Sequence, residues 1–201
     1  MSLADQSLSI ADFRRLGAFE IYGEADVAAF SKGKDVTTDT AAETKMPEDT
    51  TFRLGDLFSS PTKFRRILWL ARRPEVLPEQ LMRKFAHQVA RQCVDRLAEE
   101  GELSDIRLMA AMKAHQGHLN GERHLRSLSP LRQAVVQATR DHMEHANQRA
   151  ADGCRTVAAA LDPNAYEAGV EAAHVFMELF PDTESERWLR TCLRELIDQF
   201  K

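Results

Sequence analysis

The stretch PEQLMRKFAHQVARQCVDRLAEEG, residues 78–101, decides the fold class. Proline is well tolerated in the first turn of a helix and glycine often follows the last turn, so one helix is predicted between Pro78 and Gly101. Its apolar residues recur every three or four positions, which predicts one buried face. That core stripe consists of Leu81, Phe85, Val89, Cys93 and Leu97, with Ala86 and Ala90 beside it.

Similar start and stop signals follow along the chain. Ser104 is predicted to cap a helix with His115 on its inner face. Ser129–Pro130 predicts the start of another helix, which we expect to run past Asp152–Gly153, with a kink there, to Leu161. The last two helices are expected to begin at Asp162–Pro163 and at a capping box formed by Thr183 and Glu186.

The predicted fold class is therefore all-α, an antiparallel multi-helix bundle with a partly irregular N-terminal extension. The bundle domain is expected over residues 54–201, with Pro61 opening one of its helices. The extension, residues 1–53, is expected to hold short helices, one of them capped by Ser9 with Asp12, and at most a minor hairpin. A polar stretch at 32–50 predicts a linker or mobile loop.

Composition excludes several classes of protein. The chain has 201 residues, of which 43% are hydrophobic and 29% charged, a balance typical of neither a disordered nor a membrane protein. No apolar run approaches the ~20 residues of a spanning helix, and the first residues do not resemble a signal peptide. Cys93, Cys154 and Cys192 form no CxxC pair, so we expect free thiols in a reducing cytoplasm.

A basic belt lies between two acidic segments. Residues 61–96 carry 9 basic and 3 acidic side chains, whereas the segments on either side have a net negative charge. Such a belt is either a solvated face that pairs with its own acidic flanks, or a docking surface for an acidic protein or a phosphate backbone. Nucleic acid is the less favoured partner, because the overall charge of the chain is negative and aromatic residues do not alternate with Arg83, His87 and Arg91.

Within the belt, basic residues repeat every four positions on the side of the 78–101 helix opposite Phe85 and Val89. This spacing predicts an exposed basic stripe, with a solvated face as the plain interpretation and the docking of an acidic partner as the functional one. The candidate partner-binding residues are Arg83, Lys84, His87 and Arg91, together with Arg72 and Arg73.

Two histidines three residues apart, His142 and His145, raise the alternative of a metal-dependent helical-bundle enzyme. His174 and Asp105 are expected at a similar level of the bundle, and a site with three ligands and an open fourth position would suit hydrolytic chemistry. The favoured interpretation is that these histidines lie at the edges of helix–helix contacts. No HExxH, Walker, GxGxxG or GxSxG motif is present, so we expect no catalytic residues, metal or cofactor.

Residues 54–200 contain four stretches that carry a family resemblance. They are LGDLFSSPTKFRRILWLARR (54–73), QLMRKFAHQVARQCVDRL (80–97), RLMAAMKAHQGHLNGE (107–122) and ERWLRTCLRELIDQF (186–200). Together they resemble a bacterial family of helical, immunity-protein-like sequences without an assigned activity. The resemblance implies a helical fold and a role in toxin immunity or partner binding, and it supplies no catalytic residues. Residues 1–50 and the histidines at 142, 145 and 174 have no counterpart in the family pattern.

The function that we expect is a non-catalytic protein–protein interaction module, an immunity-like or regulatory accessory protein that binds an acidic macromolecular partner. The metal-dependent enzyme that uses His142, His145 and His174 is one alternative. A nucleic-acid-associated protein that binds through residues 61–96 is the other.

Overall fold

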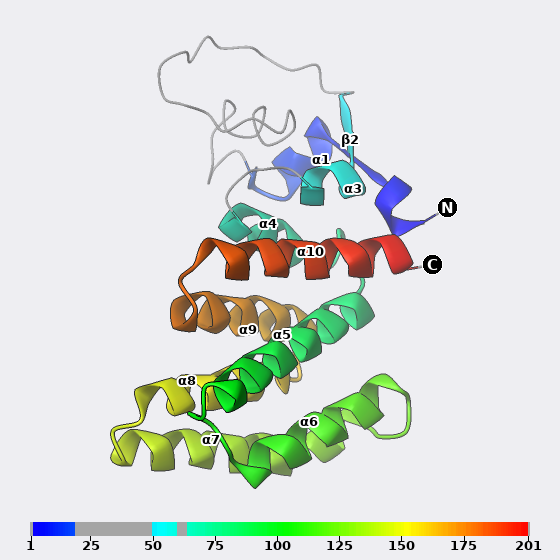
Figure 1. Ribbon diagram of the computed structural model, residues 1–201. Helices are drawn as coiled ribbons and strands as arrows, with labels where there is room; N and C mark the ends of the chain where they lie inside the picture. The colour runs from blue at the N-terminus through cyan, green and yellow to red at the C-terminus, as the bar shows by residue number, and fades with distance from the viewer. Residues whose placement is uncertain (1, 19–49, 60–63, 201) are drawn as a thin grey trace. The chain divides into compact units, whose positions relative to one another are not determined.

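The computed structural model describes residues 2–18, 50–59 and 64–200. Within these ranges 75% of the residues are helical. The only strands there are β1 (Ser7–Ser9) and β2 (Thr51–Arg53), of which β2 is labelled in Figure 1. They pair antiparallel with Leu8 opposite Phe52. The predicted all-α class is confirmed, and among the described residues before residue 54 the strands form one short pair, as expected.

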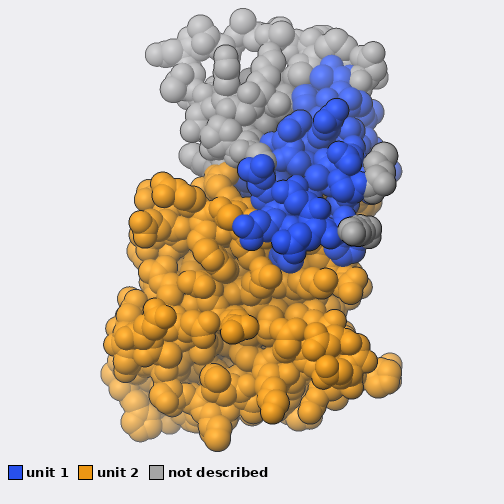
Figure 2. Space-filling model, turned by 45° about the vertical axis from the view of Figure 1, so that its right-hand side comes forward, with its two compact units in different colours: residues 1–70, 193–201 blue, residues 71–192 orange. Residues whose placement is uncertain are grey.

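The chain divides into two compact units (Figure 2). One comprises residues 1–70 and 193–201, and the other comprises residues 71–192. The predicted domain boundary between residues 53 and 54 stays a prediction. The predicted polar loop at 32–50 and the predicted helix start at Pro61 lie outside the described residues, apart from residue 50.

The first unit is built from short elements. Besides the two strands it contains η1 (Leu3–Asp5), α1 (Ile10–Arg15), α3 (Leu54–Ser59) and most of α4 (Phe64–Ala71). The predicted capping box at the start of α1 is confirmed, because Ser9 Oγ accepts a hydrogen bond from the Asp12 amide at 3.1 Å while the Ser9 amide donates to Asp12 Oδ2 at 2.9 Å. These two bonds satisfy amides that a short helix leaves unpaired at its N-terminus.

The second unit is a bundle of longer helices. They are α5 (Glu79–Glu99), α6 (Ile106–Leu119), α7 (Ser129–Glu144), α8 (Gln148–Ala160), α9 (Ala165–Leu179) and the first part of α10 (Thr183–Gln199), with the short η2 (Leu125–Leu128) before α7. Helix α5 packs against α6, α8 and α9, and α7 packs against α6 and α8. Helix α5 is therefore enclosed on several sides.

The core stripe predicted for α5 is confirmed. Phe85, Val89 and the other members of the stripe are fully buried. Two glycines on the partner helices allow α5 and its loop to approach closely. A Cβ atom on Gly169 of α9 would lie 2.5 Å from Met82 Cε, and one on Gly153 of α8 would lie 2.5 Å from Leu97 Cδ1. Both glycines therefore serve close helix packing, the role that glycine often has inside a helix.

The single long helix predicted from Ser129 to Leu161 is wrong. The chain turns between α7 and α8 at Ala146, whose φ is 57°, and Asn147 then caps α8 by accepting a hydrogen bond from the Ala150 amide at 3.1 Å. Gly153, where the kink was predicted, lies inside α8 rather than at a helix boundary. The positive φ at Ala146 and the Asn147 cap end one helix and begin the next, so α7 and α8 pack against each other.

Three predicted caps are displaced by one residue. Asp105 rather than Ser104 caps α6, and its side chain accepts from the Arg107 amide at 2.8 Å. Leu128 rather than Ser129 occupies the cap position of α7, because η2 leads directly into that helix. At the start of α10 the acceptor is Asp182 Oδ1, which takes the Ser185 amide at 2.5 Å. An aspartate beside a serine or threonine competes for the same role, and sequence alone does not rank them.

Candidate protein-interaction site

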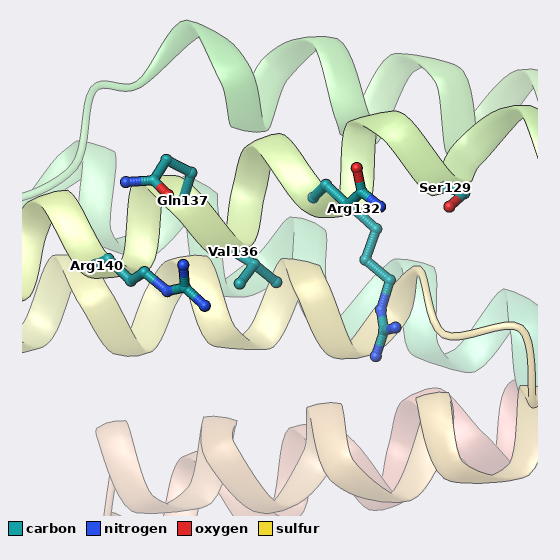
Figure 3. Close-up of a pocket in the computed structure, with 6 residues that line it drawn as sticks. Ser129, Arg132, Val136, Gln137 and Arg140 are labelled. Atoms are coloured by element: carbon teal, nitrogen blue, oxygen red, sulfur yellow. The ribbon is translucent and has the colours of Figure 1, made fainter.

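Helix α7 presents one continuous side to solvent, which we call the α7 face. Its members recur at three- and four-residue spacing, so they lie on one side of the helix. They are Ser129, Arg132, Gln133, Val136, Gln137, Arg140 and Met143. The first six line a surface hollow of about 330 Å³ (Figure 3). This volume is at the lower end of the range found for ligand pockets.

The two arginines of the α7 face stand on either side of Val136 (Figure 3). Arg132 is held in place, because its Nη2 donates to Asp162 Oδ2 at 2.7 Å and its Nε donates to the Ala158 carbonyl at 3.2 Å. Arg140 is exposed and has no hydrogen-bond or ion-pair partner among the residues that the structure describes. The six residues that line the hollow include no carboxylate, and Arg132 is paired with Asp162, so Arg140 is the group that makes the hollow favour negative charge.

An ion-pair network joins α6 to the C-terminal part of α7. Arg107 donates to Asp105 Oδ2 at 2.7 Å and to Asp141 Oδ2 at 2.5 Å. The hydrogen bonds from Arg107 lower the pKa of both aspartates below the usual value for a carboxyl group. Both carboxylates therefore stay ionised at neutral pH, and Arg107 fixes the start of α6 against α7.

Large apolar side chains beside this network are open to solvent. Ile106 and Met109 on α6 are 85% and 62% exposed, and Met143 on α7 is 55% exposed. Together with Val136 they are the exposed large hydrophobic residues of the described ranges. Ile106 and Met109 are three residues apart and therefore lie on the same side of α6, while Met143 belongs to the α7 face. Exposed apolar residues that gather in one region, rather than singly, are typical of interaction sites.

The predicted exposed basic stripe on α5 is wrong for two of its members. Arg83 is buried, donates to Glu79 and to the carbonyl oxygens of Asp162 and Pro163, and thereby holds the turn before α9. His87 is buried against α6. The prediction from residue spacing assumed that α5 has one buried side, whereas α5 contacts helices on several sides.

The remaining predicted partner-binding residues differ in their exposure and in their ion-pair partners. Arg91 is 71% exposed and 3.6 Å from Asp95, and Lys84 is half-buried. Arg72 is exposed and pairs with Glu167, and Arg73 is half-buried. Their role in partner binding stays a prediction.

The inward position predicted for His115 is confirmed, and its partner is one that the sequence did not indicate. His115 is fully buried, and its Nδ1 lies 3.4 Å from Nδ1 of His87. Burial lowers the pKa of His115 to about 3, and the neighbouring His87, His118 and Arg83 act in the same direction. Burial also lowers the pKa of His87. Both imidazoles are therefore neutral at physiological pH.

The four residues of the alternative metal site do not form one cluster. His142 Nε2 lies 3.5 Å from Asp105 Oδ2 and has no hydrogen-bond partner among the described residues. His145 is exposed and hydrogen-bonds the Asp141 carbonyl through Nδ1 at 2.6 Å, while His174 is half-buried on α9. Within residues 2–18, 50–59 and 64–200, no three His, Cys, Asp or Glu side chains are placed to hold a metal ion.

The three cysteines are free and buried, as expected. Burial raises the pKa of Cys93 and of Cys154 to about 12. A thiol with such a pKa carries almost no thiolate at neutral pH, and thiolate is the nucleophilic form. Cys93 and Cys154 are therefore core residues rather than candidate nucleophiles.

Sequence reasoning missed the α7 face. The inward side of α7 contains Val135 and Ala138, which are both fully buried. The opposite side contains arginine and glutamine, which looks like an ordinary solvated face, but it also contains Val136. An aliphatic residue between two arginines at four-residue spacing was the available signal.

No family model matches the sequence, and neither a curated protein nor a solved structure shows significant similarity to it. The immunity-like resemblance therefore stays a prediction. Among the described helices, none is both long enough and apolar enough to cross a membrane.

Proposed function

We propose that this protein is a non-catalytic interaction module that binds an acidic protein partner through the α7 face. The observation that carries the proposal is the hollow around Val136, which has Arg132 on one side and Arg140 on the other. The hollow has an apolar residue at its centre and charged groups at its rim, an arrangement that protein–protein interfaces also have. Opposite charges on the partner would steer association.

The exposed apolar residues of α6 extend the same proposal. Ile106 and Met109 add apolar area next to the ion pair that joins α6 to α7. An immunity-like or regulatory accessory role, acting in a reducing cytoplasm, agrees with a protein that binds a partner and keeps its cysteines free.

The two alternatives receive less support. For nucleic-acid binding through residues 61–96, Arg83 is buried and Arg72 and Arg91 already face carboxylates. For a metal-dependent enzyme, His145 is exposed and takes part in no metal-binding group among the described residues.

Affinity capture with chemical cross-linking, from the organism that makes the protein, tests the proposal. The bait is the full chain, as wild type and as three single variants: Val136→Asp, Arg140→Glu and Arg91→Glu. The first two change the α7 face, and the third is a matched charge reversal on α5. We expect one cross-linked partner that both α7 variants lose and Arg91→Glu retains.

The opposite pattern, with the partner lost only in Arg91→Glu, would move the site to the exposed part of α5 that contains Arg91. A partner retained by all three variants would contradict binding at either surface. Circular dichroism of each bait checks the fold, which we expect to be intact because all three changed side chains are exposed.

A further inference from the structure

The geometry of the α7 face points to one kind of occupant: an amphipathic helix of the partner whose apolar edge is flanked by carboxylates. This inference rests on the proposed function and adds the type of segment that is bound. Three features of the described residues carry it, namely the length of the face, the shape and composition of its centre, and the position of its charges.

The length of the face matches a helix of about four turns. From Ser129 to Met143 the face advances 14 residues, which is roughly 21 Å at 1.5 Å per residue. Its members follow the three- and four-residue rows that form the ridges and grooves of a helix surface. A second helix packs onto such rows by placing its own ridge between them. A helix laid along α7 therefore makes contact over the whole face.

The centre of the face accepts an apolar side chain. Val136 lies within the hollow. The volume of the hollow, about 330 Å³, leaves room for a large aliphatic or aromatic group of the partner. Gln133 and Gln137 line the same hollow, and although Gln137 Nε2 donates to Asp141 Oδ1 at 2.9 Å, Gln133 offers an amide donor and an acceptor to the partner's edge. An apolar residue with polar neighbours on both sides is what an amphipathic helix presents.

The positive charges of Arg132 and Arg140 favour negatively charged residues on the flanks of the partner helix. Arg140 is unpaired within the described part of the chain, so a carboxylate placed there gains a full ion pair. Arg132 already donates to Asp162 and is held in one orientation, which reduces the entropy lost when a second carboxylate approaches it. The two arginines are eight residues apart, roughly 12 Å along α7, so the partner needs acidic residues about two turns apart.

Nucleic acid fits this face less well than an acidic helix. None of the residues that line the hollow is aromatic, so bases have nothing to stack on. The two arginines stand singly on either side of Val136, an arrangement that suits two separate carboxylates better than a continuous phosphate backbone.

Binding of designed peptides to the full chain tests the inference. The probe is a fluorescein-labelled peptide of about 18 residues, long enough for the four turns of contact, with leucine at three- and four-residue spacing and glutamate on both flanks. One control peptide replaces the glutamates with lysine. A second control keeps the glutamates but carries two central prolines, which break the helix. Fluorescence anisotropy gives the dissociation constants at low and at physiological salt.

We expect saturable binding of the acidic helix alone, weakened about tenfold or more by Arg140→Glu and by Val136→Asp. Arg91→Glu should change the dissociation constant less than about twofold, because distant surface charges are screened. Equal binding of the proline-broken peptide, or preference for the lysine peptide, overturns the inference. So does the absence of saturable binding below ~1 mM, the level of a very weak complex.

The two proposals fail in different ways. If the captured partner depends on Val136 and Arg140 while the acidic helix does not bind, only the inference about the helix is lost. If neither capture nor peptide binding responds to these residues, the proposed function fails as well. A chain that forms dimers by light scattering, and loses them in Val136→Asp, would show that the face belongs to a second copy and would also overturn the inference. Should a variant misfold, the comparison of the three peptides on the wild-type chain still decides the outcome.

Discussion

The Nδ1 atoms of His87 and His115 lie 3.4 Å apart where α5 meets α6, and His115 is wholly shielded from solvent. One nitrogen must donate a proton to the other for this contact to be a hydrogen bond, so the neutral pair shares one proton between the two Nδ1 atoms. The charged and titratable groups that act on the pair are Arg83 and Arg91 of α5 and His118 of α6. All three disfavour protonation of the histidine that they act on. A hydrogen bond with Gln116 favours protonation of His87.

The histidine pair predicts a loss of stability in mild acid. The pKa of His115 is about 3 in the folded chain and near 6.5 in the unfolded chain. The unfolded state therefore binds more protons below pH 6.5, and the free energy of unfolding falls as the pH decreases from 6.5 toward 3. For His115 the slope is about 1.4 kcal/mol per pH unit once the pH is well below 6.5. Urea unfolding at pH 7, 6 and 5 measures it.

His115→Gln should flatten that slope whatever it does to stability at pH 7. His124→Gln is the matched control, because His124 is exposed, and the slope should persist in it. Parallel pH profiles for wild type and His115→Gln would show that the buried pair is not the source of the acid sensitivity.

Arg83→Met should destabilise the chain far more than Arg91→Met, although both arginines belong to α5. Arg83 is buried and satisfies the carbonyls of Asp162 and Pro163, which its removal leaves without a donor. Each buried unsatisfied group costs about 1–3 kcal/mol, so the loss should exceed ~2 kcal/mol. A substitution at exposed Arg91 should stay within about 0.5 kcal/mol. Equal unfolding midpoints in denaturant would contradict the buried position of Arg83.

Arg107→Met should loosen α6 from α7. The substitution removes donors from Asp141 and from Asp105, whose side chain is only 9% exposed. We expect a loss of about 1–3 kcal/mol from the partly buried carboxylate that remains. Arg155→Met breaks a more exposed pair with Asp152 and should cost about 0–1 kcal/mol. Hydrogen exchange of α6 amides should accelerate in the first variant and not in the second.

Gly153→Ala should be destabilising even though alanine is the better helix former. The added Cβ would lie 2.5 Å from Leu97 Cδ1 and 2.9 Å from Leu103 Cδ2, and both leucines are buried. Overpacking of this kind costs about 1–3 kcal/mol, more than the ~1 kcal/mol gained from helix propensity. At Gly169 the closest atom is the flexible end of Met82, so Gly169→Ala should cost less. Thermal or urea unfolding of the two variants gives the comparison.

Much of the helical architecture was predictable from the sequence. The helix expected between Pro78 and Gly101 runs from Glu79 to Glu99, with its predicted apolar stripe buried. The break at Ala146 was not predictable by the same means, because alanine is the best helix former and its positive φ depends on how α7 and α8 pack. Asn147 was the available signal, and Asp152–Gly153 looked like the stronger one.

The candidate site was less predictable than the fold. Periodicity locates a residue on a helix but does not show how many sides of that helix are covered. Arg83 and His87 looked like members of an exposed stripe until α6, α8 and α9 enclosed α5. On α7 the reverse holds, since the side that contains Val136 has no helix over it in the described structure and forms a hollow instead. Tertiary contacts decide both cases, and one sequence does not reveal them.

The turn between α8 and α9 connects the α7 face with the centre of the bundle. The Asp162 carboxylate accepts from Arg132 of α7, while the carbonyl oxygens of Asp162 and Pro163 accept from buried Arg83 of α5. A ligand that draws Arg132 away from Asp162 must therefore also shift the energy of this turn. The coupling is reciprocal. If binding at the α7 face changes the equilibrium constant for forming the turn by some factor, then forming the turn changes the binding constant at the α7 face by the same factor. Through Arg132 and Arg83, binding at the surface of α7 is thus coupled to the buried part of α5.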